Sequence, residues 1–317
     1  MLKSYNEFLL EKEGSDLFKI YLAYNPDYGH RFWTYKDYST DKFFIKLTPE
    51  NYKDIKINKD FPVLNYNNDF TNTLLDEGLI KKENVYNLPE YVEDSGSKTK
   101  FHKKMEGTGL VPATCHSKEE EIKEVGFPMI CKPSQGHSGK GIIIVKDQDG
   151  FDKLDHSEVD LYSEYIDKSE AHRFFNFKGE AFFWQERTPT NDKAKTGEGG
   201  DKDTMMFDYK KRKIEGLDDS YKEVIAKVSE IFKDLPFLCL DLMKDQSGKV
   251  YVIETNAMPG VPFDSTVDIY KKLFSDFYGH QVNPESNNIL KACSNIMNSK
   301  TIKGYRDYDK GRFSIED

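Results

Sequence analysis

Residues 237–260, FLCLDLMKDQSGKVYVIETNAMPG, constrain the fold more than any other stretch of this sequence. Two apolar runs flank the turn DQSG at 245–248, which predicts an antiparallel hairpin. Residues two apart in a strand share a face, so Glu254 and Asn256 lie together on the second strand. The hairpin can bring Asp241 beside them from the first strand. The sheet that contains these strands must therefore accommodate two acids and an amide.

This acidic hairpin favours a functional interpretation. A lone carboxylate in a strand usually lies at an edge or faces solvent, but two acids and an asparagine in apolar strands are costly to bury without partners. Mg²⁺ takes carboxylate, amide and phosphate oxygens as ligands. We therefore expect Asp241, Glu254 and Asn256 to bind metal that is shared with a nucleotide.

A second motif is the glycine-rich stretch CKPSQGHSGKG at 131–141. Its glycines allow backbone N–H groups to turn toward a ligand, and its serines add hydroxyl donors, which suits a polyphosphate. Taken alone, the stretch favours a tight hairpin between two strands over a phosphate-binding loop. It is not a Walker loop, because the GK[ST] ending that opens a helix is absent and a strand follows.

Length and charge restrict the class of protein. A chain of 317 residues is long for a single hydrophobic core, so two or three lobes are expected. The net charge of -9 gives no basic surface for nucleic acid or acidic lipid, although a local basic pocket for phosphate is compatible with it. Four scattered cysteines show neither zinc-ligand spacing nor a disulfide framework.

The order of motifs predicts three parts: an α/β domain at 1–96, a nucleotide-binding subdomain at 97–167 and a metal-binding subdomain at 168–317. Short apolar strands at 127–133, 141–147 and 160–166 belong to the second part. The third part begins with an aromatic hairpin that turns at Lys178-Gly179. The polar, Gly-rich residues 188–203 predict a mobile lid, and the sequence at 219–235 has the period of a packed amphipathic helix.

Phosphate binding needs several cations. Opposite charges ~4 Å apart attract by ~4 kcal/mol at an effective dielectric of ~20, so one lysine cannot neutralise a triphosphate. The sequence offers four basic residues near the two motifs, which two metal ions would supplement: Lys98, Lys132, Arg173 and Arg212. Each of them taken singly is consistent with a solvated surface charge, and only the pattern assigns them to a site.

Five segments together resemble a known family. They are SKTKFHKKMEGTGLVPAT (97–114), FPMICKPSQGHSGKGIIIV (127–145), LYSEYIDKSE (161–170), FDYKKRK (207–213) and ETNAMPGVPF (254–263). From Lys98 to Phe277 the chain resembles the ATP-grasp ligases and is most similar to the D-alanine:D-alanine ligases, with a looser likeness to ribosomal-protein glutamate ligases and glutathione synthetases. The resemblance implies an α/β (α+β) fold in which two subdomains clamp ATP between antiparallel sheets.

The resemblance also implies roles for residues. Residues expected to bind ATP phosphates are Lys98, Lys132, Ser134, Gly136, His137, Ser138, Gly139 and Gly141. Residues expected at the adenine and ribose are Glu164, Tyr165, Ile166 and Glu170. The metal ligands are Asp241, Glu254 and Asn256. The residues expected at the transferred phosphoryl and acyl oxygens are Arg212, with Lys211 as the neighbouring candidate, Arg173 and the N–H of Gly260.

Three departures from the family pattern are present, and two of them concern the substrates. Cys239 stands where these ligases carry an arginine two residues before the metal aspartate, so the cation must come from elsewhere, with Arg173 and Arg187 as candidates. Ser97 also replaces the usual aspartate before the first lysine. The first 96 residues show no glycine-rich or glutamate motif that would place the first substrate.

The function that these features imply is ATP-dependent joining of a small-molecule or peptide carboxylate to an amine through an acyl phosphate, with ATP and two Mg²⁺, or Mn²⁺, as cofactors. An ATP-grasp kinase acting on a hydroxyl and a non-catalytic ATP-binding module are the alternatives. No signal-peptide core and no apolar run of ~20 residues is present, so we expect a soluble cytoplasmic protein. The segment after residue 282 is compatible with a homodimer contact, a packing helix or a wall of the acceptor site.

Overall fold

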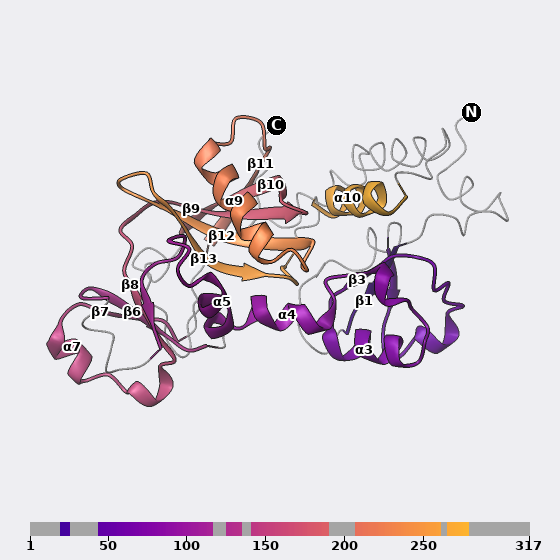
Figure 1. The fold of residues 1–317 in the computed structure, drawn as a ribbon, viewed down its shortest axis with the longest axis horizontal. Coiled ribbons are helices and arrows are strands. Elements are labelled where there is room, and N and C mark those ends of the chain that lie inside the picture. The colour runs from indigo at the N-terminus through magenta and orange to yellow at the C-terminus, as the bar shows by residue number, and fades with distance from the viewer. Residues whose placement is uncertain are drawn as a thin grey trace. The chain divides into compact units, whose positions relative to one another are not determined.

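The computed structural model describes residues 20–25, 44–116, 125–134, 141–189, 207–260 and 265–278. The chain divides into two compact units (Figure 1). One unit comprises Met1–Pro89 and Met258–Lys310, and the other comprises Glu90–Ala257 and Gly311–Asp317. The chain thus returns to the first unit directly after the acidic hairpin, and the predicted divisions at residues 96 and 167 stay predictions.

The first unit contains a parallel sheet of order β2-β1-β3-β4. Its strands are β1 (Ile20–Ala23), β2 (Phe44–Leu47), β3 (Val63–Asn65) and β4 (Val85–Tyr86). Its helices are η3 (Tyr52–Asp54), α3 (Asn68–Asp76), η4 (Lys82–Asn84) and α10 (Thr266–Tyr278). Buried apolar strand residues pack against α3, which agrees with the expected α/β domain.

Helix α10 returns to the first unit through aromatic contacts. The ring of Tyr270 meets that of Phe44 at a centroid distance of 5.8 Å, and the Tyr86 hydroxyl lies 2.8 Å from a carboxylate oxygen of Asp276. The Tyr66 hydroxyl also donates to the carbonyl oxygen of Pro259 at 2.9 Å. These contacts explain why the residues after 257 leave the second unit.

The second unit begins with α4 (Pro89–Gly96) and α5 (Lys98–Met105) and contains two antiparallel sheets. The smaller sheet has the order β5-β8-β6-β7. Its strands are β5 (Thr114–Cys115), β6 (Met129–Lys132), β7 (Ile143–Val145) and β8 (Leu161–Glu164), with α7 (Gln148–Asp152) and η5 (His156–Glu158) between β7 and β8. The three predicted strands of this region are confirmed.

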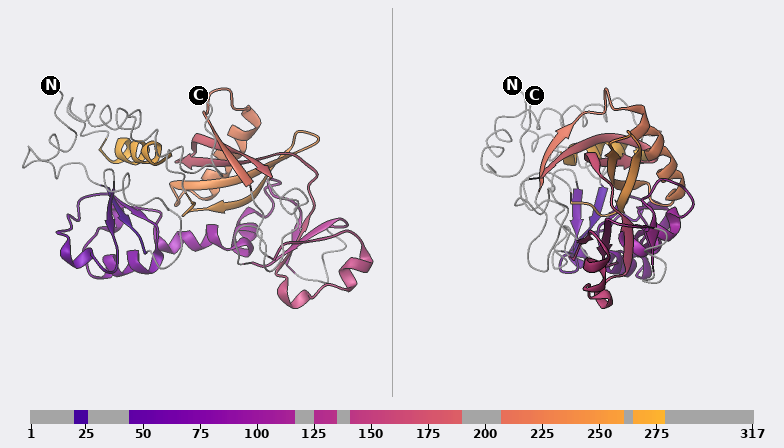
Figure 2. Two further views of the ribbon diagram at one scale, coloured as in Figure 1. Left: turned by 180° about the vertical axis from the view of Figure 1, so that it is seen from behind. Right: turned by 90° about the vertical axis from the view of Figure 1, so that its left-hand side faces the viewer.

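The larger sheet has the order β11-β10-β9-β12-β13. Its strands are β9 (Lys168–Phe177), β10 (Glu180–Pro189), β11 (Phe207–Arg212), β12 (Phe237–Asp245) and β13 (Val250–Asn256). Both predicted hairpins are confirmed, and the turn between β9 and β10 has positive φ at Lys178 and Gly179. Figure 2 shows the twist of this sheet. The predicted lid at 188–203 lies largely outside the described residues.

The two faces of the larger sheet carry different side chains. Helix α9 (Asp219–Ile231) covers the face that presents His172, Phe174 and Asn176, because the Tyr221 ring contacts Phe174 and the Asn176 amide donates to the Ser229 hydroxyl at 2.7 Å. Period-two alternation places Arg173 and the residue paired with it, Asp241, on the opposite face. The predicted metal ligands therefore lie away from α9.

Within the described part of the chain, no helix is both long enough and apolar enough to cross a membrane.

Candidate functional site

Asp241 is the centre of the candidate site, and its side chain is 5% exposed. Arg173 donates through Nε to Oδ1 at 2.7 Å and through Nη2 to Oδ2 at 2.8 Å, and Arg187 Nη1 donates to Oδ2 at 2.8 Å. The strand register produces this arrangement, because Arg173 stands opposite Asp241 on β9 and Gln185, opposite Arg173 on β10, is two residues from Arg187. Burial raises the pKa of Asp241, but the two arginines outweigh burial and hold that pKa below its usual range.

Glu254 lies next to Asp241 across the β12–β13 hairpin. Its side chain is 41% exposed, and its Oε1 lies 3.8 Å from Arg173 Nη2. Removal from water and then the adjacent Asp241 carboxylate raise the pKa of Glu254, while Arg173 and Lys98 oppose that rise. A cation placed between the two carboxylates would relieve their repulsion.

The donor set fits a magnesium ion. A carboxylate offers about four lone-pair sites, and three of those on Asp241 accept hydrogen bonds from the arginines. Glu254 remains partly exposed, and Asn256 follows it on the same strand face. Among the described residues, no three His, Cys, Asp or Glu side chains form a metal site by themselves. The amide of Asn256 and phosphate oxygens would thus have to complete the coordination.

Two lysines face this acidic hairpin. Lys132 ends β6 and is 7% exposed, and Lys98 begins α5. Burial and then the charge of Lys98 lower the pKa of Lys132 to about 8, whereas Glu254 raises it. Burial also lowers the pKa of Lys98, which Glu254 likewise opposes. Two ammonium groups that repel each other and are removed from water form a site that favours an anion.

His102 is a member of this site that the motifs did not reveal. Its Nε2 lies 3.3 Å from Lys132 Nζ, and the residue is 4% exposed. Burial and then the charge of Lys132 lower the pKa of His102 to about 2, so the imidazole is neutral. The available sequence signal was helical spacing, because residues four apart in a helix are neighbours and His102 follows Lys98 by one turn.

Ser134 connects the two lysine-bearing elements. Its hydroxyl accepts a hydrogen bond from Thr99 Oγ1 at 2.8 Å, its carbonyl accepts one from the Lys98 N–H at 3.2 Å, and its own N–H donates to Asp160 Oδ2 at 2.6 Å. The sequence assigned this serine to phosphate, and the structure uses it to fix the start of α5 beside the end of β6.

The rest of the glycine-rich stretch is described only at its end. Gly141 has φ +75, and a Cβ there would lie 3.0 Å from Pro133 Cγ, so this position requires glycine. The remaining predicted phosphate ligands lie outside the described residues: Gly136, His137, Ser138 and Gly139.

The predicted adenine hinge follows β8. The backbone N–H of Glu164 donates to the carbonyl of Ala113 at 2.8 Å, and the Glu164 carboxylate accepts from the Ala113 N–H at 3.3 Å. The Tyr165 N–H donates to the Pro128 carbonyl at 3.3 Å, and Ile166 is buried. These bonds hold the hinge against its own sheet, and its contact with adenine stays a prediction.

The register separates two predicted site residues from Asp241. Glu170 accepts hydrogen bonds from His172 Nε2 and the Tyr221 hydroxyl, both at 2.9 Å, on the face covered by α9. Arg212 pairs with Trp184 in the ladder and donates to Glu186 Oε2 at 2.7 Å on that same face. The motif match fixed their positions in the sequence, but strand alternation decides the face.

Lys211 and Lys168 are two other basic residues associated with the face of the sheet that carries Asp241, or with its arginines. Lys211 pairs with Gln185, and Gln185 pairs with Arg173, so its register position is on the Asp241 face. Burial and then the charge of Arg187 lower the pKa of Lys168 at the start of β9. The motifs did not single out Lys168. Gly260 belongs to the other unit, so its predicted role toward an acyl oxygen stays a prediction.

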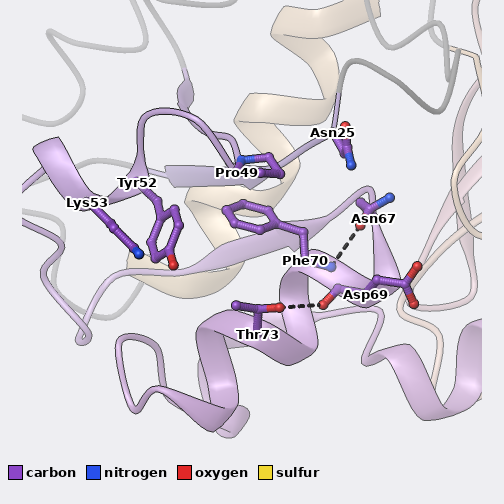
Figure 3. A pocket seen from close by; sticks show the side chains of 8 residues that line it. All are labelled: Asn25, Pro49, Tyr52, Lys53, Asn67, Asp69, Phe70 and Thr73. Atoms are coloured by element: carbon purple, nitrogen blue, oxygen red, sulfur yellow. Dashed lines mark hydrogen bonds between the residues drawn. The ribbon is translucent and has the colours of Figure 1, made fainter.

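The first unit has a cleft of its own, with a volume of ≈ 340 Å³ (Figure 3). It lies at the carboxyl ends of parallel strands, where ligands bind in open α/β sheets. Asn67 is 4% exposed and its Oδ1 accepts from the Phe70 N–H at 2.8 Å, which begins α3. The lining residues are Asn25, Pro49, Tyr52, Lys53, Asn67, Asp69, Phe70 and Thr73. Charges of both signs and amides suit a small polar molecule, and no sequence motif marked this cleft.

Comparisons with solved structures identify the fold. The ATP-grasp ligase PsnB in complex with a minimal precursor aligns with a TM-score of 0.54 at 14% identity, over 83% of this chain and 99% of that one. The D-alanine–D-alanine ligase from Bacillus anthracis in complex with ATP aligns at 0.51 and 18%, over 82% and 95%. The N5-carboxyaminoimidazole synthetase from Staphylococcus aureus in complex with ADP aligns at 0.51 and 12%, over 80% and 73%.

Neither a protein-family model nor a curated protein matches the chain. Identities below 20% support a statement about the fold and not about a shared reaction. Coverage of most of this chain nevertheless confirms the predicted mixed α/β architecture with antiparallel sheets. The chain has the ATP-grasp fold.

Proposed function

We propose that this protein is an ATP-dependent ligase that joins a carboxylate to an amine and releases ADP and phosphate. The observation that carries the proposal is the arrangement of charges around Glu254. Lys132 from β6 and Lys98 from α5 supply positive charge, and Arg173 and Asp241 lie beside Glu254 in the larger sheet. Similar folds are described as ligases and in two cases hold ATP or ADP. An anion-binding site opposite an acidic pair is what a magnesium nucleotide needs.

The proposed reaction has two steps. In the first, a carboxylate oxygen of the substrate attacks the γ-phosphorus of ATP, the bond from that phosphorus to the β-phosphate oxygen breaks, and ADP leaves with an acyl phosphate remaining. In the second, the amine nitrogen attacks the acyl carbon, the bond from that carbon to the oxygen bridging it to phosphorus breaks, phosphate leaves with that oxygen, and the amine nitrogen loses a proton. Positioning and charge neutralisation would supply most of the catalysis.

The lysines and the acidic hairpin would hold the nucleotide. Lys98 and Lys132 would attract phosphate oxygens more strongly than exposed lysines do, because both are removed from water. Asp241, Glu254 and Asn256 would hold Mg²⁺. When bound, the metal would supply Lewis-acid stabilisation of charge on the phosphate oxygens.

Arg173 and Arg187 would replace the cation that is absent at position 239. Cys239 is buried, and burial raises the pKa of its thiol, so it supplies neither charge nor a nucleophile. The two guanidinium groups meet on the neighbouring carboxylate, Asp241. Guanidinium groups suit the planar carboxylate of a substrate and the oxyanion that develops from it, because they donate charge-assisted hydrogen bonds in a planar arrangement.

An acyl-phosphate trap tests the reaction class. The purified protein is incubated with MgATP, hydroxylamine and a panel of carboxylates, and hydroxamate and ADP are measured together. We expect equal amounts of both products for the correct carboxylate, and neither from the Glu254→Gln variant. A stable phosphate ester without hydroxamate would instead identify a kinase, and tight ATP binding without ADP release would identify a binding module.

A further inference from the structure

We infer that His102 is a positioning residue that fixes the ammonium group of Lys132 for phosphate binding. The inference rests on the proposed function, because it assumes that Lys132 binds a nucleotide. His102 Nε2 and Lys132 Nζ are 3.3 Å apart, and both residues are more than nine-tenths buried. A lysine ammonium group has three donors and no acceptor, so the imidazole nitrogen must accept the bond.

The chemistry of the partner is what makes this contact informative. Within the described part of the chain, no ion pair joins Lys132 to a carboxylate. A carboxylate at position 102 would hold the ammonium group equally well, but it would cancel the charge that attracts phosphate. A neutral imidazole orients the ammonium group and leaves its charge available.

Packing alone does not account for the histidine. When Nε2 accepts from Lys132, the ring proton is on Nδ1, and Nδ1 is buried with no hydrogen-bond partner in the described structure. Burying an unpaired polar atom is unfavourable, and an apolar side chain of similar size would avoid that cost. The one paired nitrogen of this imidazole meets Lys132, the lysine that we assign to phosphate.

The elements on either side fix this geometry. His102 lies on α5, one turn after Lys98, and Lys132 is the last residue of β6. Ser134 joins the two elements through Thr99 Oγ1 and the Lys98 N–H. Since both ends are anchored, the side chain at position 102 decides where Lys132 Nζ lies.

Two polar variants of equal charge provide the test. In His102→Gln the side-chain amide reaches the place of Nε2, whereas in His102→Asn it reaches only the place of Nδ1. MgATP binding is measured by calorimetry, KM and kcat by ADP release, and thermal stability by unfolding. We expect His102→Asn to weaken MgATP binding and raise KM about tenfold with a smaller change in kcat, and His102→Gln to remain within about threefold of the unchanged protein. His156→Gln, at a histidine that contacts Tyr162 and the Phe151 carbonyl, serves as the control.

Two other patterns of MgATP affinity would overturn the positioning role of His102. Equal MgATP affinity for His102→Asn and the unchanged protein would overturn the positioning role. Equal weakening by His102→Asn and His102→Gln, at equal melting temperature, would also overturn it, because the loss would then not depend on the acceptor. If the unchanged protein itself binds no MgATP, the proposed function fails rather than this inference.

Discussion

At the scale of single residues, burial disfavours the charged forms of both Lys132 and Asp241, but opposite charges outweigh burial only at Asp241. The arginines keep Asp241 ionised despite its burial. Burial and then the charge of Lys98 lower the pKa of Lys132 to about 8, and its hydrogen-bond partner His102 is neutral. Between that value and the ordinary lysine pKa of ~10.4, the unfolded chain binds more protons than the folded one, so this lysine's contribution to stability rises with pH there. Its contribution to anion binding falls over the same range.

The pH dependence of nucleotide binding checks this assignment. We expect MgATP affinity to fall as the pH rises above about 8, because the free protein loses the Lys132 proton. Lys132→Arg should bind more weakly at neutral pH but lose that alkaline decline, because a guanidinium group stays protonated. Calorimetry from pH 6.5 to about 9.5 would measure both. A decline of equal size in Lys132→Arg would assign the titration to another group.

At the scale of secondary structure, the register of the larger sheet decides which basic residues meet the acids. Arg173 stands opposite Asp241, whereas Arg212 stands opposite Trp184 on the face that α9 covers. A motif that is aligned by sequence order can identify the correct strand and still assign the role to the residue next to the one that faces the site. That single residue moves a side chain to the other face of the sheet.

The same substitution on the two faces measures this difference. We expect Arg173→Lys to lower turnover by about a hundredfold, because it removes the bidentate hydrogen bonds to Asp241 and the guanidinium group proposed to stabilise the oxyanion. Arg212→Lys should leave turnover within about twofold, because its partner Glu186 is partly exposed and lies on the face of the sheet opposite to Asp241. ADP release with MgATP and substrate measures both, and melting temperatures verify folding. A large loss in Arg212→Lys with normal activity in Arg173→Lys would contradict the assignment of faces.

The turn before β7 gives a prediction on stability. Gly141 and Gly78 both have positive φ, but only a Cβ at Gly141 would meet another side chain, at 3.0 Å from Pro133 Cγ. Gly141→Ala should therefore destabilise the fold by about 1 kcal/mol or more beyond the effect of Gly78→Ala, which isolates the cost of φ. Urea unfolding measures both variants. Equal effects would show that the contact with Pro133 is relieved without cost.

At the scale of the whole molecule, the sequence predicts the second unit better than the first. Local patterns marked both hairpins, three of the four strands of the smaller sheet and α9, because each depends on neighbouring residues. The acid pair was predictable because one hairpin contains Asp241 and Glu254. The cleft in the first unit was not, because parallel strands far apart in sequence build it.

Other features depend on contacts that a linear pattern does not contain. The return of α10 to the first unit depends on Phe44 and Tyr86, more than 180 residues before their partners. The arginine pair on Asp241 depends on which strands are neighbours in the sheet. The pairing of His102 with Lys132 depends on how a helix and a strand are joined at Ser134.

The central claim is that two lysines and an acidic hairpin on an ATP-grasp fold bind a magnesium nucleotide. Calorimetric titration of the unchanged protein and of Lys132→Met with MgATP tests that claim most directly. We expect single-site binding by the unchanged protein and a loss of at least tenfold in affinity for Lys132→Met at equal melting temperature. No heat with the unchanged protein, or equal affinities for the two proteins, would contradict it.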